Sequence, residues 1–197
     1  MESLTSFLIA ALALAGSPGP NTLTVAATAA AFGRSKGFQF MLGVNLGMAI
    51  VIAMTGFGIT GLLIAIPGAA PVIATLAAAY FIYLAYRIAT SPPVADNPET
   101  GTEPRWYEGV LLSLVNPKGY AAMSAMFSTF TLLPADTVAD AVLKATLLML
   151  VIVFVNLSWL FAGVALTRFL KNERSSRMLN VVFAATLIVS VLVTAII

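Results

Sequence analysis

Long apolar stretches constrain this chain more than any other feature of its sequence. The longest, 138–166, is interrupted by charge only at Asp140 and Lys144, near one end. Of 197 residues, 60% are hydrophobic and only 9% are charged. A water-soluble fold of this size could not hide so much apolar surface, because small domains have a high ratio of surface to volume. We therefore expect an all-α membrane protein with lipid as its solvent.

The apolar stretches are long enough to cross a bilayer six times. A helix needs about 20 apolar residues to span a hydrocarbon core of roughly 30 Å. The stretches are 4–31, 38–62, 69–88, 108–133, 139–167 and 177–197. Their unbroken apolar character differs from the alternating pattern of β-barrel strands. The first stretch is too long for a signal peptide and has no basic residue before it, so we expect it to be retained.

The basic residues predict the orientation of these spans. Most of them fall in or beside the first, third and fifth predicted loops, namely Arg34, Lys36, Arg87, Arg105, Arg168, Lys171, Arg174 and Arg177. By the positive-inside rule these loops are cytoplasmic, and both termini face outside. The polar, Pro-rich stretch 91–104 fits a surface linker. We expect a single transmembrane transporter domain over 1–197, with a first repeat at 1–90, a cytoplasmic linker at 91–107 and a second repeat at 108–197.

Short motifs recur in the two halves. Ser17-Pro18-Gly19-Pro20-Asn21 in the first stretch pairs with Asn116-Pro117-Lys118 in the fourth, and Asn45 in the second pairs with Asn156 in the fifth. Because three crossings are an odd number, the second half would enter the bilayer upside down. We predict six transmembrane helices arranged as two inverted three-helix repeats, an arrangement found in many secondary transporters.

The paired prolines predict that helices 1 and 4 are broken. Proline removes a backbone donor and clashes with the preceding turn. Ser17 before Pro18, and Asn116 before Pro117, each fit an N-cap followed by proline at the first helical position. Each new half-helix would direct free N–H groups and the positive end of its dipole into the membrane. A rise of about 1.5 Å per residue puts both breaks near mid-membrane, where a substrate carboxylate would fit between them.

Lys118 lies at the second break, where an ammonium group needs a counter-charge or water. No acid occurs at that depth in the predicted spans, so a substrate carboxylate is one candidate partner, and snorkelling to the inner headgroups is the alternative. Asn45 and Asn156 have two interpretations of equal weight, interhelical hydrogen bonding and substrate contact. The predicted substrate-binding residues are Ser17, Pro18, Gly19, Pro20, Asn21, Asn45, Asn116, Pro117, Lys118 and Asn156.

Composition narrows the function further. The chain has no His and no Cys, which excludes His or Cys metal sites, Ser-His-Asp catalysis and disulfides. We expect no enzyme activity, no cofactor and no metal. A net charge of +2 does not indicate nucleic acid. The residues favour a secondary transporter that moves a small zwitterionic substrate by alternating access, with a passive channel for small solutes as the alternative. Membrane lipid is the other expected partner, and a homo-oligomer stays open.

Three motifs match a known family in order and spacing. They are Ser17-Pro18-Gly19-Pro20-Asn21-Thr22-Leu23, Gly33-Arg34-Ser35-Lys36-Gly37 and Asn116-Pro117-Lys118. Together they resemble the LysE/RhtB-type amino-acid exporter family, the lysine exporter superfamily. The runs 83–92, 127–130 and 155–159 look most like its cysteine/O-acetylserine exporter branch.

The resemblance implies efflux of amino acids or close derivatives across the bacterial inner (plasma) membrane, two three-helix repeats and energy from the proton gradient. One departure concerns coupling. Many relatives carry an acid directly after the glycine that Gly47 matches, whereas this chain has Met48.

Overall fold

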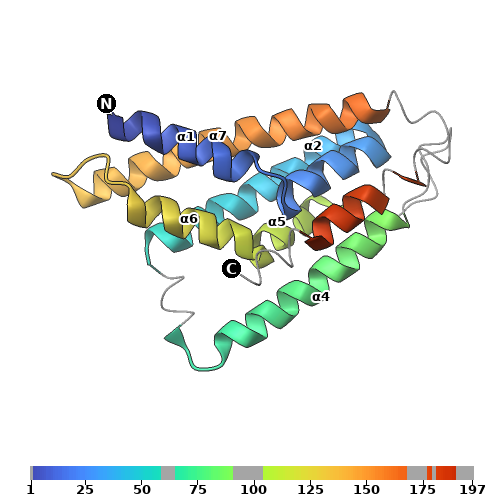
Figure 1. Cartoon of the computed structure of the whole chain (residues 1–197), viewed down its shortest axis with the longest axis horizontal. Helices are drawn as coiled ribbons and strands as arrows, with labels where there is room; N and C mark the ends of the chain where they lie inside the picture. The colour runs from blue at the N-terminus through green and yellow to red at the C-terminus, as the bar shows by residue number, and fades with distance from the viewer. Residues whose placement is uncertain (1, 59–64, 91–103, 168–176, 179–180, 190–197) are drawn as a thin grey trace.

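The computed structural model describes residues 2–58, 65–90, 104–167, 177–178 and 181–189, and within these ranges it contains helices and no strand. Figure 1 shows α1 (Glu2–Gly16), α2 (Pro20–Gly56), α4 (Ala69–Ala89), α5 (Trp106–Val115), α6 (Pro117–Thr129) and α7 (Thr137–Thr167). Residues 181–189 are also helical. The all-α expectation is confirmed for this part of the chain. Most of the linker 91–107 and part of the stretch 177–197 lie outside the described residues.

Helix α2 is a hairpin of two helical arms joined at Gly33. This residue has φ 82° and ψ 172°, a left-handed conformation that glycine adopts without a Cβ clash. Figure 1 shows the ribbon running to one end of the molecule and returning from there. A Cβ on Gly37 would lie 2.7 Å from the Cβ of Ala29, so the arms touch beside the turn. The two arms coincide with parts of the predicted first and second stretches.

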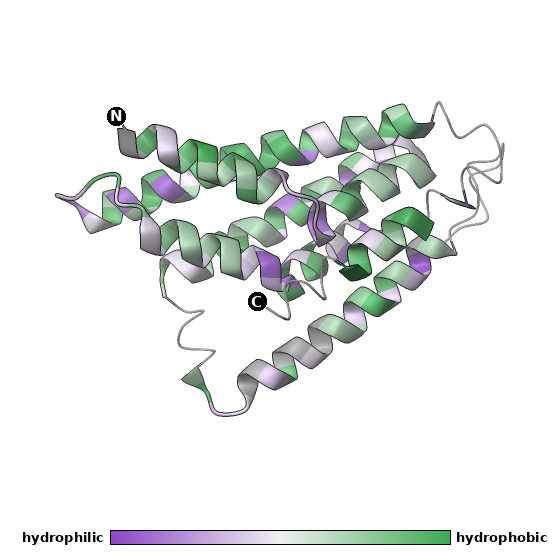
Figure 2. Cartoon of the chain, viewed as in Figure 1, coloured by the Kyte–Doolittle hydropathy of each residue, from purple (hydrophilic) through white to green (hydrophobic). Residues whose placement is uncertain are grey.

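Apolar side chains cover the outside of the bundle, and polar ones lie inside. Leu150 is 62% exposed, whereas Asn156, on the same helix, is 2% exposed. Figure 2 shows hydrophobic residues along most of the helix surfaces and hydrophilic ones in short patches. By length and composition, two described helical segments qualify as candidate membrane spans, Thr137–Leu166 and Pro20–Gly56, and the second of these folds back on itself at Gly33. This distribution suits a lipid solvent, in which backbone groups are satisfied within helices.

Helices α2 and α5 meet backbone to backbone along a glycine seam, which comprises Gly43, Gly47 and Gly109. A Cβ on Gly43 would lie 1.7 Å from the carbonyl oxygen of Trp106, and one on Gly109 would lie 2.6 Å from that of Phe40. Real side chains do not come so close, so the seam exists only because these positions have no Cβ. Small residues allow the same close approach between helices in membranes generally.

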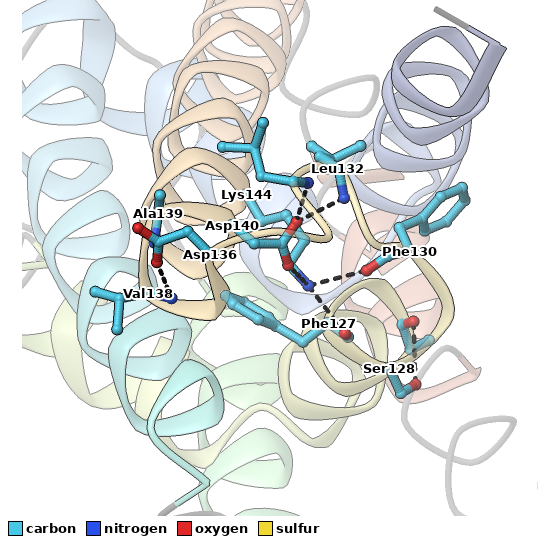
Figure 3. A network of polar contacts seen from close by, with 11 residues as sticks. Phe127, Ser128, Phe130, Leu132, Asp136, Val138, Ala139, Asp140 and Lys144 are labelled. Carbon is cyan, nitrogen blue, oxygen red and sulfur yellow. Dashed lines mark hydrogen bonds and ion pairs between the residues drawn. The ribbon is translucent and has the colours of Figure 1, made fainter.

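An ion pair between Asp140 and Lys144 closes the corner between α6 and α7 (Figure 3). Nζ of Lys144 lies 2.7 Å from Oδ2 of Asp140, and both residues are buried. The same ammonium donates to the carbonyl oxygens of Phe127 and Phe130, at 3.1 and 2.9 Å. Oδ1 of Asp140 accepts from the backbone N–H groups of residues 132 and 133, at 2.5 and 2.8 Å. One buried pair therefore holds both the end of α6 and the connection that follows it.

Helix α4 is attached to the bundle near its C-terminal end. Phe81 and Leu84 are buried in the core, and the hydroxyl of Tyr80 donates to the carbonyl oxygen of Glu108 at 2.9 Å. Arg87 forms an ion pair with the Glu108 side chain. Figure 1 shows the other end of α4 leaning away from the remaining helices.

Candidate functional site

The helical path stops and restarts at two proline-containing sites. Helix α1 ends at Gly16 and α2 begins at Pro20. Helix α5 ends at Val115, and α6 begins at Pro117 with Asn116 as its N-cap residue. Because a helix lacks internal acceptors for its first N–H groups, both α2 and α6 start with backbone donors that their own turns do not use.

At the first site the helix begins two residues later than expected. The prediction that Ser17 caps a helix starting at Pro18 is wrong, because the N-cap residue is Gly19, with φ −164° and ψ 179°. A residue before proline is disfavoured in the helical conformation, so Gly19 stays extended and the helix can start only at Pro20. The cap is closed by Thr22, whose hydroxyl accepts from the Gly19 N–H at 3.0 Å.

The two helix starts are joined by a direct hydrogen bond. Nδ2 of Asn116 donates to Oδ1 of Asn21 at 3.0 Å. Nδ2 of Asn21 in turn donates to the hydroxyl of Ser113 at 3.2 Å, and that hydroxyl donates to the carbonyl oxygen of Val44 at 2.9 Å. All four residues are buried. The N-termini of α2 and α6 therefore lie within the reach of one small solute.

Lys118 reaches across to the end of α1. Its Nζ donates to the carbonyl oxygen of Ser17 at 2.8 Å, to the Ser17 hydroxyl at 2.6 Å, and to the carbonyl oxygen of Pro18 at 3.3 Å. These acceptors lie at the negative end of the α1 dipole, where a cation is stabilised. The sequence pattern indicated no protein partner for this ammonium, because the spans hold no acid at that depth. Free backbone carbonyls at the end of a broken helix cannot be recognised from the sequence.

A cavity of about 60 Å³ lies where these elements meet. A buried water needs about 10–15 Å³, so the cavity has room for several water-sized groups. Seven of the predicted site residues line it: Ser17, Gly19, Pro20, Asn21, Asn116, Lys118 and Asn156. Pro18, Pro117 and Asn45 do not. Asn45 instead accepts a hydrogen bond from Nδ2 of Asn156 at 2.6 Å, which fits the interhelical interpretation of that pair.

One polar atom of the cavity lining lacks a partner. Oδ1 of Asn116 is buried and accepts no hydrogen bond from any residue that the structure describes. The whole residue is 3% exposed. An unsatisfied buried acceptor costs about 1–3 kcal/mol, so a hydrogen-bond donor that reached this atom would be stabilised there.

Sequence reasoning missed the apolar part of the lining. Met48, Met123, Ile152 and Val155 all face the cavity. Met48 stands out in the sequence only because it replaces an acid of the resembled family. The other three are apolar residues in apolar helices, and nothing in the sequence separates them from their lipid-facing neighbours. Ser113 was missed as well, since it contacts Asn21 only through folding.

Comparison with known proteins identifies the family of this chain. The family model described as LysE type translocator matches residues 12–195. The cysteine/O-acetylserine efflux protein of Escherichia coli O157:H7 is 30% identical over 185 residues, which cover 94% of this chain and 93% of that protein. Its counterpart in Escherichia coli strain K12 is 29% identical over the same shares. No solved structure matches. The resemblance seen in the motifs is confirmed, and the chain belongs to the LysE type translocator family.

Proposed function

We propose that this translocator is a secondary transporter that exports small neutral amino acids or close derivatives across the bacterial inner membrane by alternating access. The names of its relatives, cysteine/O-acetylserine efflux proteins, support such a cargo. One observation carries the proposal: two helix N-termini meet at a cavity lined by Lys118 and by Asn116, whose buried Oδ1 has no hydrogen-bond partner among the described residues. A zwitterion offers a carboxylate to the first and an ammonium to the second.

The carboxylate of the cargo would bind between the starts of α2 and α6. Each helix N-terminus carries about half a positive elementary charge. The backbone N–H groups of Asn21, Thr22 and Lys118 belong to these first turns and have no helical acceptor. For Lys118 to pair with the carboxylate through Nζ, its ammonium must leave the carbonyl oxygens of Ser17 and Pro18. Cargo binding would then loosen the contact between α6 and α1.

The ammonium and side chain of the cargo would face different parts of the lining. Oδ1 of Asn116 would accept from the ammonium. The apolar residues Met48, Met123, Ile152 and Val155 would surround a small uncharged side chain. No carboxylate lines the cavity among the described residues, so a cationic side chain would enter without a counter-charge, at a considerable desolvation penalty.

Helix boundaries support the following path through the membrane. Helix α1 with the first arm of α2 would form span 1, and the second arm of α2 would form span 2. Helix α4 would form span 3, α5 with α6 span 4, and α7 span 5. Span 6, at 177–197, rests on the apolar sequence of that stretch. We propose that these form one domain over 1–197 in two inverted repeats, with loops 1, 3 and 5 cytoplasmic and both termini outside.

Counterflow in proteoliposomes tests the proposal. Vesicles loaded with unlabelled L-cysteine should transiently accumulate labelled L-cysteine from outside, with and without a pH gradient in parallel. Lys118→Ala should abolish the overshoot, whereas Lys36→Ala, the same change at the Gly33 turn, should keep it. A passive channel would let the label equilibrate without an overshoot. A panel of labelled amino acids that all fail to show counterflow would refute the transporter.

A further inference from the structure

We infer that Ser113, which does not line the cavity, is a positioning residue that determines which atom of Asn116 faces the cargo. The inference rests on the proposed function, because it concerns how the site distinguishes an ammonium from other groups. Ser113 lies on α5 and is 0% exposed. A Cβ on Gly47 would lie 2.6 Å from the Cβ of Ser113, so the serine is tightly enclosed at the glycine seam.

A chain of hydrogen bonds runs from the seam to the cavity, and its direction is set at the seam. The carbonyl oxygen of Val44 can only accept, so the single hydroxyl proton of Ser113 is donated to it, at 2.9 Å. The Ser113 oxygen can then only accept from its other neighbour. Asn21 must therefore turn its Nδ2 toward Ser113, as it does at 3.2 Å.

The orientation of Asn21 in turn fixes the orientation of Asn116, which lines the cavity. With Nδ2 facing Ser113, Asn21 presents Oδ1 to the next residue in the chain. Asn116 must therefore donate to that oxygen from its own Nδ2, which lies 3.0 Å away. The remaining atom of the Asn116 amide, Oδ1, is left without a partner among the described residues and belongs to a side chain of the cavity lining. An acceptor at this place suits an ammonium.

The reversed chain would present the opposite chemistry. If both amides flipped, Ser113 would have to give its proton to Asn21, and the bond to the Val44 carbonyl would be lost. Asn116 would then point Nδ2, a donor, at the cargo. Since an asparagine amide has nearly the same shape in both orientations, packing alone does not choose between them. The hydroxyl of Ser113 determines which amide orientation is adopted.

Ser113→Ala should therefore weaken discrimination more than binding. Without the hydroxyl, both amide orientations leave one group unpaired beside residue 113, and the cavity presents a mixture of acceptor and donor. We expect the preference for a ligand with an ammonium over the same ligand without one to fall by about tenfold, the usual scale of one hydrogen bond to a charged group. A purely structural role would weaken both ligands by the same factor.

Equilibrium binding to the purified full chain in nanodiscs tests this prediction. The two probes are L-cysteine and 3-mercaptopropanoate, which is L-cysteine without its amino group. The wild type should prefer L-cysteine, and Ser113→Ala should lose most of that preference. Ser128→Ala, the same change at an exposed serine of α6, should keep it. Asn116→Asp presents an acceptor in either orientation, so adding Ser113→Ala to that variant should no longer change the ratio.

The possible outcomes separate the proposed cargo site from the positioning role of Ser113. A wild type that does not bind L-cysteine at all refutes the proposed cargo site, and the inference with it. A wild type that prefers L-cysteine, together with an unchanged ratio in Ser113→Ala, refutes the positioning role alone. Equal effects of Ser113→Ala in the wild type and in the Asn116→Asp variant would also refute it, because the serine would then act by some route other than the amide orientation.

Discussion

Asp140→Asn should destabilise this protein strongly, because it breaks the buried pair at the α6–α7 corner. Asp140 is 6% exposed and Lys144 is 5% exposed. The asparagine oxygen can still accept from the N–H groups of residues 132 and 133, so these bonds survive. The Lys144 ammonium, however, loses its carboxylate partner and keeps the neutral carbonyls of Phe127 and Phe130. Removing one partner of a buried pair costs about 3–5 kcal/mol.

The reciprocal change, Lys144→Met, should cost a similar amount for a different reason. It leaves the Asp140 carboxylate buried and orphans the two carbonyl oxygens at the end of α6, each at about 1–3 kcal/mol. Asp140→Asn combined with Lys144→Met removes both charges at once. We expect the double variant to be more stable than the sum of the single losses by about 1–3 kcal/mol, yet still below wild type because the carbonyls stay unsatisfied.

Thermal unfolding in a single detergent measures these differences. For a chain of this size 1 kcal/mol corresponds to about 2–4 °C in Tm, so Asp140→Asn should lower Tm by about 6–20 °C. Asp136→Asn is the matched control, since Asp136 is exposed and its Oδ1 accepts from two backbone N–H groups that an asparagine oxygen can also serve. A Tm for Asp140→Asn equal to that of the control would refute the reasoning.

Three further predictions concern the cavity, the seam and the orientation. Gly19→Ala would place a Cβ 2.9 Å from Nζ of Lys118; since the extended Gly19 backbone accepts any residue, only the lysine must move, and counterflow should fall by about tenfold. Gly16→Ala, with open space around its Cβ, should transport at the wild-type rate. Equal transport rates in Gly19→Ala and Gly16→Ala would contradict a role of Lys118 in transport. Gly43→Ala would place its Cβ 1.7 Å from a backbone oxygen of α5 and should prevent stable folding, seen as loss of the monodisperse peak in size-exclusion chromatography; a normal peak would contradict the seam. Ser35→Cys, in a chain without other cysteines, should be labelled by an impermeant maleimide in inside-out vesicles, and labelling confined to right-side-out vesicles would overturn the orientation.

Local sequence signals predicted where helices begin, but they did not predict which residues contact one another at these helix starts. Proline and glycine act through their own backbone, so the break near residues 17–20 was visible, although the preference of the residue before Pro20 moved the start by two positions. The partner of Lys118 was not visible, because Ser17 lies about a hundred positions away and offers neutral oxygens. Ser113 gave no signal at all, since its hydroxyl donates to the Val44 carbonyl and accepts from Asn21, two contacts that only folding creates.

The glycine seam limits how this molecule can move. It joins α2, from the first half of the chain, to α5, from the second, with the backbone at Gly43 and Gly109 directly against the backbone of the other helix. Such a contact resists sliding, because any shift along the helices would drive a neighbouring side chain into a carbonyl group. The contact still allows rotation, so the angle between the two halves can change about it. If the two halves open and close as proposed, the movement should be largest far from Gly43 and smallest beside it.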